Sequence, residues 1–190
     1  MNEELIKKAM QMFDTPEKWN AFRVLVESNI VDRWWKKLQT EVYQRELRAG
    51  DPDWDIRVWT NWDIKWFPKK DPENALMIHF CGDTFNLPFN FGYLDTNKVN
   101  KLIEDHRFNV IKTCFDRYDG SDSNQIGWET RNFSFGTTSE FRTAMNLCWY
   151  AGNETEEFAN QIIKKVRKFQ TPEVTELFRE INRECKKDNQ

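Results

Sequence analysis

The sequence has few of the residues on which metal sites, disulfide frameworks and flexible linkers depend. It contains two histidines, four cysteines, seven glycines and six prolines in 190 residues. So little glycine and proline argues against long disordered linkers, and the length fits a single domain, residues 1–190, with a sizeable core. The cysteines are widely separated and lie in apolar stretches, so we expect reduced, buried thiols. They are Cys81, Cys114, Cys148 and Cys185.

A long apolar run and an excess of positive charge are also missing. The longest apolar run, Ala75 to Cys81, is far shorter than the roughly 20 residues that cross a bilayer. Glu3 and Glu4 stand where a secretory signal carries positive charge. A net charge of −3 argues against a general binder of nucleic-acid phosphates. We therefore expect a cytoplasmic protein without membrane contact, and the oligomeric state is not predicted.

Local signatures of catalysis are absent. The sequence has no G-x-S-x-G elbow, no glycine-rich phosphate loop and no C-x-x-C pair. His79 and Cys81 project to the same side of a predicted strand, but a metal site needs at least three protein ligands. Only His106 or Cys114, on other predicted elements, would complete the set. We therefore expect no metal and no cofactor.

The residues that are present divide the chain into three regions. Residues 1–50 predict helices, because apolar side chains recur at helical spacing and Thr15-Pro16-Glu17 is a strong start signal. Gly50 has the position of a helix-ending residue. Residues 137–190 predict three more helices, with a capping-box spacing at Thr137 and a second start signal at Thr171-Pro172-Glu173.

Residues 54–135 predict a sheet that one helix, about Thr96 to His106, interrupts. Ten aromatic residues lie between Trp54 and Tyr93, including four of the nine tryptophans. Pro88 favours an edge position for its strand, because proline cannot donate to the sheet. The five expected strands are Ile56–Phe67, Ala75–Cys81, Phe85–Phe91, Val110–Phe115 and Ile126–Phe135. The fold class is therefore α+β, with a mostly antiparallel sheet of about five strands between N-terminal helices and three C-terminal helices.

One string matches a catalytic pattern. Pro52-Asp53 followed by Asp63-Ile64-Lys65 fits the PD-(D/E)xK arrangement of metal-dependent nucleases, whose two carboxylates share a Mg²⁺ ion. If Ile56 to Phe67 is one strand, the two carboxylates lie roughly 30 Å apart, and a turn at Thr60-Asn61 still leaves roughly 17 Å. Both distances argue against this site.

Trp59 is out of phase with the apolar residues of its strand and therefore lies on the polar face. Tryptophan and arginine are enriched at binding hot spots, so this face is a candidate interaction surface. The competing interpretation is that a helix packs over the face and buries Trp59. The expected binding residues are Arg57, Trp59, Asn61, Asp63, Lys65 and His79.

These observations favour a non-catalytic protein-binding module of the inhibitor or adaptor type, with another protein as its partner. The alternative is a divergent metal-dependent nuclease or hydrolase. A nucleic-acid-binding module is a further alternative, with the Lys69-Lys70 loop as its best local phosphate contact. In the enzyme alternative the catalytic residues are Asp63, Lys65, His79 and Glu129.

Overall fold

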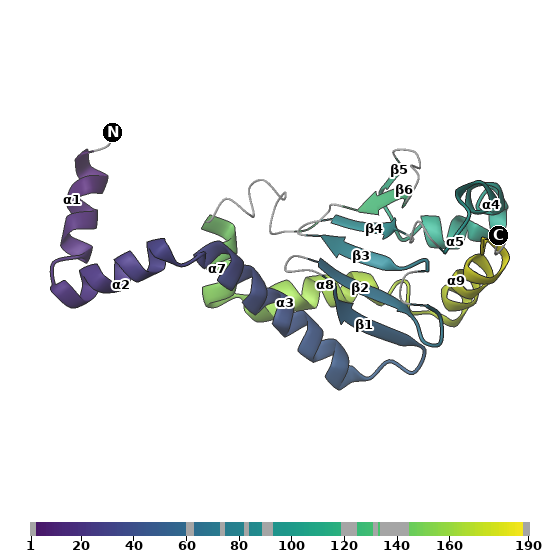
Figure 1. Cartoon of the computed structure of the whole chain (residues 1–190), viewed down its shortest axis with the longest axis horizontal. Coiled ribbons are helices and arrows are strands. Elements are labelled where there is room, and N and C mark those ends of the chain that lie inside the picture. The colour runs from purple at the N-terminus through teal and green to yellow at the C-terminus, as the bar shows by residue number, and fades with distance from the viewer. Residues whose placement is uncertain are drawn as a thin grey trace.

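Helices precede and follow a single antiparallel sheet, which confirms the predicted α+β class (Figure 1). The structure is a computed structural model that describes residues 3–59, 63–72, 75–81, 84–88, 93–118, 125–130, 133 and 145–187. Thr137 and the capping box predicted to begin there lie outside these residues. Among the described helices, none combines the length and apolar composition needed to cross a bilayer.

The N-terminal helices are α1 (Glu3–Met12), α2 (Pro16–Glu27) and α3 (Ile30–Ala49). The predicted start signal is confirmed, because the Thr15 hydroxyl accepts a hydrogen bond from the Lys18 N–H at 3.2 Å. The predicted end is confirmed as well. Gly50 follows α3 in the left-handed conformation, with φ at 62°, which glycine adopts without a Cβ clash.

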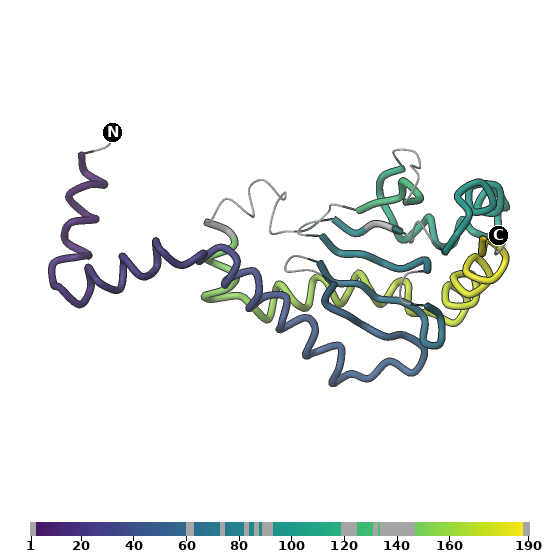
Figure 2. The backbone as a smooth tube through the Cα atoms, in the orientation of Figure 1, coloured from purple at the N-terminus to yellow at the C-terminus, as the bar shows by residue number. Residues whose placement is uncertain are grey.

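The first two helices form an arm that projects away from the rest of the chain (Figures 1 and 2). Neither α1 nor α2 contains a buried residue. Phe13 and Phe22 contact each other across the bend, with ring centroids 4.3 Å apart, and Trp19 adds a second ring contact at 5.6 Å. The apolar stripes predicted for these helices therefore meet solvent and not a core.

The sheet has six strands in the order β1-β2-β3-β4-β6-β5, and every neighbouring pair is antiparallel. Its strands are β1 (Trp54–Val58), β2 (Asp63–Pro68), β3 (Ile78–Cys81), β4 (Thr84–Pro88), β5 (Arg117–Tyr118) and β6 (Gln125–Thr130). The predicted strand from Ile56 to Phe67 is in fact a hairpin, because β1 pairs with β2 from Trp54↔Pro68 to Val58↔Ile64.

Two further strand predictions are wrong. The segment Val110–Phe115 is not a strand, because α5 (Asn109–Lys112) occupies its first half and a turn follows, and Ile111 and Phe115, four residues apart, are both buried. The strand with Pro88 is not an edge strand, because β4 lies between β3 and β6. Pro88 is tolerated there since it ends the strand, where the register with β6 shifts. The predicted helix between strands is α4 (Thr96–Leu102), followed by the single turn η1 (His106–Phe108).

The C-terminal helices are α7 (Met145–Asn153), α8 (Thr155–Val166) and α9 (Pro172–Glu184). Helices α3 and α8 pack together along one face of the sheet, where the fully buried Trp35 meets Phe80 and Phe158 (Figure 1). Helix α9 covers the end of the sheet, with the Phe178 ring 5.1 Å from the Trp54 ring. Aromatic contacts between helices and strands therefore form the core.

A buried carboxylate links these layers. Glu46 of α3 accepts a hydrogen bond from the Trp66 indole N–H at 3.1 Å and pairs with the Arg167 guanidinium at 2.7 Å. Burial raises the pKa of the Glu46 carboxyl above its ordinary value, although the charge of Arg167 lowers it in part. The buried Glu46 carboxylate therefore joins α3 to the sheet through Trp66 and to the end of α8 through the partly exposed Arg167.

Candidate functional site

The residues predicted to share the polar face do share one face of the sheet. In the register of the strands, Arg57 pairs with Lys65, Lys65 pairs with His79, and Asp63 pairs with Cys81. Paired residues project to the same side of an antiparallel sheet. Their neighbours Ile64 and Phe80 point to the opposite side, into the core beneath α3. The predicted binding residue Asn61 lies outside the described residues.

This face is neither an open polar surface nor a fully covered one. Lys65 is only 2% exposed to solvent, and Phe67 and Met77 on the same face are also buried. Trp59 remains 48% exposed, and Arg57 is exposed. The Lys65 ammonium lies 4.7 Å from the centre of the Trp59 ring, and the Trp59 and His79 rings contact each other edge to face with their centroids 5.5 Å apart. Trp59 therefore shields Lys65 and His79 on one side and meets solvent on the other.

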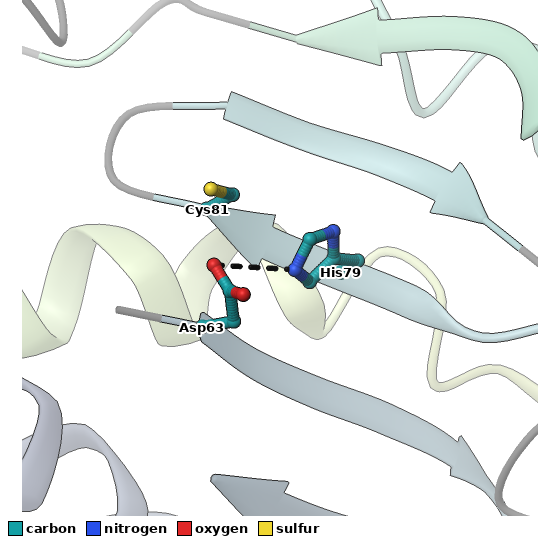
Figure 3. Close-up of side chains that lie close together, drawn as sticks. All are labelled: Asp63, His79 and Cys81. Carbon is teal, nitrogen blue, oxygen red and sulfur yellow. Dashed lines mark ion pairs between the residues drawn. The ribbon is translucent and has the colours of Figure 1, made fainter. Parts of the chain in front are cut away.

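Beneath Trp59, three side chains converge at one end of β2 and β3 (Figure 3). The Nε2 atom of His79 lies 3.4 Å from the Oδ1 atom of Asp63. One ligand atom from each of Asp63, His79 and Cys81 lies within 4.8 Å of the other two. The side chains of Asp63 and His79 are 16% and 13% exposed. The group is thus close to the surface but largely screened from water.

The backbone at Asp63 is fixed by two hydrogen bonds. Its carbonyl oxygen accepts from the Trp59 N–H at 3.0 Å and from the Gln39 side-chain amide at 3.0 Å. Gln39 is a buried polar residue on α3. The start of β2 is therefore tied both to β1 and to the helical layer, which holds Asp63 opposite Cys81.

Glu129, the fourth residue of the predicted catalytic set, does not join this group. It is paired with Asn86, which is paired in turn with His79, so two strand spacings of about 4.8 Å separate it from His79. Its carboxylate pairs with Arg117 at 3.5 Å. Of the four residues in the enzyme alternative, Asp63, Lys65 and His79 therefore lie close together on one face, and Glu129 lies too far away to act with them.

The other predicted metal ligands lie elsewhere. The sequence pattern places His106 on the apolar side of its predicted helix with Leu102 and Ile103, and this placement is wrong. Its side chain is exposed beside Asp105, with a 3.2 Å distance between Nδ1 and Oδ1. The Cys114 thiol donates to the carbonyl oxygens of Val110 and Lys168, and burial raises its pKa. The residue that joins His79 and Cys81 in this group is Asp63, which the sequence places on the right face without grouping it with Cys81.

The carboxylates of the nuclease-like string lie at opposite ends of the hairpin. Asp53 directly precedes the first residue of β1 and pairs with Arg179 at 3.2 Å. Asp63 lies opposite Trp59 and pairs with His79. Six residues at about 3.3 Å each separate these positions, roughly 20 Å, so the two carboxylates do not meet.

The Lys69-Lys70 loop, the predicted phosphate contact, follows β2. Its Lys69 ammonium donates to the Asp51 carbonyl at 2.6 Å.

The chain matches no family model, no curated protein and no solved structure, so its function is argued from its own residues.

Proposed function

We propose that the chain is a non-catalytic protein-binding module of the inhibitor or adaptor type. The observation that carries this proposal is the arm formed by α1 and α2, which contains no buried residue. Trp19 at its centre is 55% exposed. The large apolar side chains that the arm presents to solvent are Leu5, Ile6, Met10, Met12, Trp19, Val24, Leu25 and Val26.

Isolated helices as short as these are marginally stable in water. The two helices have 10 and 12 residues, below the length at which even alanine-rich helices persist alone. Apolar patches of this kind mark interaction sites on soluble proteins. An apolar groove on another protein is the surface that an amphipathic helix fits, with side chains at helical spacing as anchors. Binding therefore supplies the burial that the arm lacks within its own chain.

Trp59 and Arg57, at the end of β1, provide a second exposed contact. Among the predicted binding residues that the structure describes, these two have the exposure that a direct contact needs. Lys65 and His79 contact the Trp59 ring, and the Asp63 carbonyl accepts the Trp59 N–H. Asn61 keeps its predicted role as a contact on sequence grounds.

The proposal includes a cytoplasmic setting, which the thiol chemistry supports. All four cysteines are free. Burial raises the pKa of Cys185 to about 11, so its thiol is protonated and unreactive at neutral pH. Cys148 is exposed, contrary to the burial expected for it. An exposed free thiol is stable in a reducing compartment and prone to oxidation outside one.

Affinity capture with matched variants tests the proposal. The baits are the full chain, a Leu5→Ser/Trp19→Ser arm variant, a Trp59→Ala/Arg57→Ala variant and a Trp149→Ala control. Trp149 is as exposed as Trp19, at 55%, but lies on α7. We expect a stoichiometric protein partner whose affinity falls at least tenfold in the arm variant, falls less in the Trp59 variant and is unchanged in the control. Truncation of a hot spot costs about 2 kcal/mol or more, which is this tenfold loss or greater.

A partner retained equally by all four baits would sink the proposal, as would a screen that captures no stoichiometric protein. Light scattering of the purified chain covers the case of self-association. If the chain forms a dimer that the arm variant abolishes, the arm binds a second copy, and the adaptor function is rejected.

Metal-dependent hydrolysis is a second candidate function, and one observation favours it. Asp63 and His79 lie together beside Lys65 on the same face, as the enzyme alternative requires. Thermal unfolding with and without Mg²⁺, Mn²⁺ or Zn²⁺ tests this candidate, since a specifically bound metal raises the apparent stability by mass action. No shift in the midpoint at millimolar metal would reject the hydrolase and leave the protein-binding function untouched.

A further inference from the structure

We propose that Asp63, His79 and Cys81 form a binding site for a zinc-class divalent cation, with water as the fourth ligand. This site goes beyond the protein-binding function and does not depend on it. It supplies the metal that the hydrolase candidate would use. The three residues come from two adjacent strands and converge on one point (Figure 3).

The spacing of the ligand atoms is close to that of a tetrahedral site. Zinc binds imidazole nitrogen at about 2.0 Å, carboxylate oxygen at about 2.1 Å and thiolate sulfur at about 2.3 Å, which places neighbouring ligand atoms roughly 3.5 Å apart. The Asp63 and His79 atoms already lie 3.4 Å apart. No separation within the group exceeds 4.8 Å. Side-chain rotations that shift the ligand atoms by about 1 Å therefore bring the widest separation close to the tetrahedral value without moving the strands.

Cysteine, histidine and aspartate also make nucleophilic triads, and the geometry separates the two cases. In a triad, one ring nitrogen faces the nucleophile and the other faces the carboxylate. Here Nε2 of His79 faces Asp63, while the other ring nitrogen points away from Cys81 (Figure 3). A single ring nitrogen directed at a centre shared with a carboxylate and a thiol is the arrangement of a metal ligand.

The strands hold this group in place before any ion arrives. Asp63 lies directly opposite Cys81 in the β2–β3 register, and His79 is two residues from Cys81 on the same side of β3. The hydrogen bonds from Trp59 and Gln39 to the Asp63 carbonyl fix the end of β2. Ligands on paired strands are more precisely placed than ligands on loops, so little ordering is needed on binding.

The mixed donor set selects the class of ion. Magnesium and calcium prefer oxygen ligands throughout, whereas one sulfur, one nitrogen and one oxygen suit zinc and, in the laboratory, cobalt. Three protein ligands leave the fourth tetrahedral position to water, the arrangement of catalytic zinc sites. The low exposure of Asp63 and His79 strengthens their attraction for a cation.

Lys65 opposes the binding of a cation and offers an independent test. It lies directly opposite His79, and its ammonium rests over the Trp59 ring at 4.7 Å and the Phe67 ring at 5.9 Å. Its positive charge repels a bound ion in this poorly solvated position. A Lys65→Met variant keeps most of the shape of the side chain and should bind zinc more tightly than the wild type.

Cobalt titration of the folded full-length chain tests the site. We expect a sulfur-to-cobalt charge-transfer band in the near-ultraviolet, which zinc abolishes by competition. The band should vanish in Cys81→Ser and remain in Cys114→Ser, a matched control with a partly buried thiol outside the group. Asp63→Asn and His79→Gln should each weaken cobalt binding at least tenfold, with circular dichroism as the check on folding.

A folded wild-type chain that shows no such band, or a band that survives in Cys81→Ser, would overturn the site. If a ligand variant fails to fold, zinc should still raise the thermal midpoint of the wild type, and Lys65→Met should increase that rise. Absence of both effects rejects the proposal. The capture experiment stays separate, because Cys81→Ser should retain the protein partner whether or not the metal binds.

Discussion

The same three residues, Thr-Pro-Glu, stand at the start of α2 and of α9. The two helices nevertheless lie in opposite environments, one in solvent and the other against the core. At the start of α2, the Thr15 hydroxyl accepts from the Lys18 N–H at 3.2 Å, and at the start of α9, the Thr171 hydroxyl accepts from the Val174 N–H at 3.3 Å. The helices are 12 and 13 residues long. Yet α2 buries none of its residues and α9 buries six. Local chemistry thus sets where a helix begins, and the surrounding layers decide whether it belongs to the core.

The two helices differ in their surroundings and also in their pattern, because the apolar residues of α9 gather on one face more strongly than those of α2. Helix α9 places Val174, Phe178 and Ile181 at helical spacing against the end of the sheet, where Trp54 meets Phe178 and donates to the Thr175 hydroxyl at 2.8 Å. Helix α2 carries apolar residues of similar size with no sheet beneath them. Substitutions at equivalent places in the two helices should therefore have very different effects on the stability of the fold.

The largest difference is expected for aromatic side chains. Phe178→Ala should lower the free energy of unfolding by about 3–5 kcal/mol, because it removes a fully buried ring and leaves a cavity. Trp19→Ala in the arm should change it by less than about 0.5 kcal/mol, as for an exposed position. Urea denaturation followed by circular dichroism measures both. Equal losses for the two variants would show that the arm is part of the cooperative core.

Charged pairs should divide in the same way. Glu46→Ala should cost about 2–3 kcal/mol, because Trp66 and Arg167 lose an acceptor inside the core. Glu27→Ala in α2 is the matched change, since it breaks an exposed pair with Arg23 at 3.7 Å. Exposed pairs of this kind contribute little, so Glu27→Ala should be near neutral in the same urea titration. A stability loss from Glu27→Ala as large as that from Glu46→Ala would show that the pairs in the arm and in the core contribute equally, contrary to this prediction.

The buried carboxylate of Glu46 also gives the stability of the fold a pH dependence. The raised pKa of Glu46 means that the folded chain binds this proton more tightly than the unfolded chain. Its contribution to stability is therefore greatest below the ordinary pKa of glutamate, about 4.3, and falls as pH rises through the folded-state value. Glu46→Gln should gain stability relative to the wild type over that window. Unfolding free energies measured at a series of pH values test this, and a constant difference would contradict it.

The smallest difference is expected at the helix caps. Thr171→Ala should lower the free energy of unfolding by about 1 kcal/mol, because the first turn of α9 loses its capping acceptor. Thr15→Ala removes the same bond from α2 and should leave global unfolding unchanged. Its effect should show only as a small loss of helical signal at low temperature. A midpoint lowered equally by both substitutions would mean that α2 unfolds together with the body.

The start signals and the end of α3 were predictable from sequence because they depend on residues within one turn. The hairpin was not. Residues of β1 and β2 pair symmetrically about position 61, as in Val58↔Ile64 and Trp54↔Pro68, so even-numbered residues face even-numbered ones. The alternation of apolar and polar residues therefore continues through the turn, and a period of two fits a single strand equally well.

The candidate site was partly predictable for the same reason. Alternation alone placed Asp63, Lys65 and His79 on one face, and strand pairing confirms that placement. It did not reveal that Asp63 lies opposite Cys81, because register between separate strands is a long-range property of the fold. The burial of Lys65 was not predictable, since a lysine on a polar face ordinarily meets water.

The arm also makes the molecule divisible. No buried residue precedes Trp35 among those described, so the body would keep its whole core if the chain were cut at Ser28 or Asn29. A segment that contributes nothing to the core opens at little cost in free energy and is cleaved first. In the terms of protein turnover, the proposed function makes a free chain the substrate for trimming and a chain whose arm is held by its partner a protected one. Under that proposal, the supply of the partner sets how long the intact chain survives.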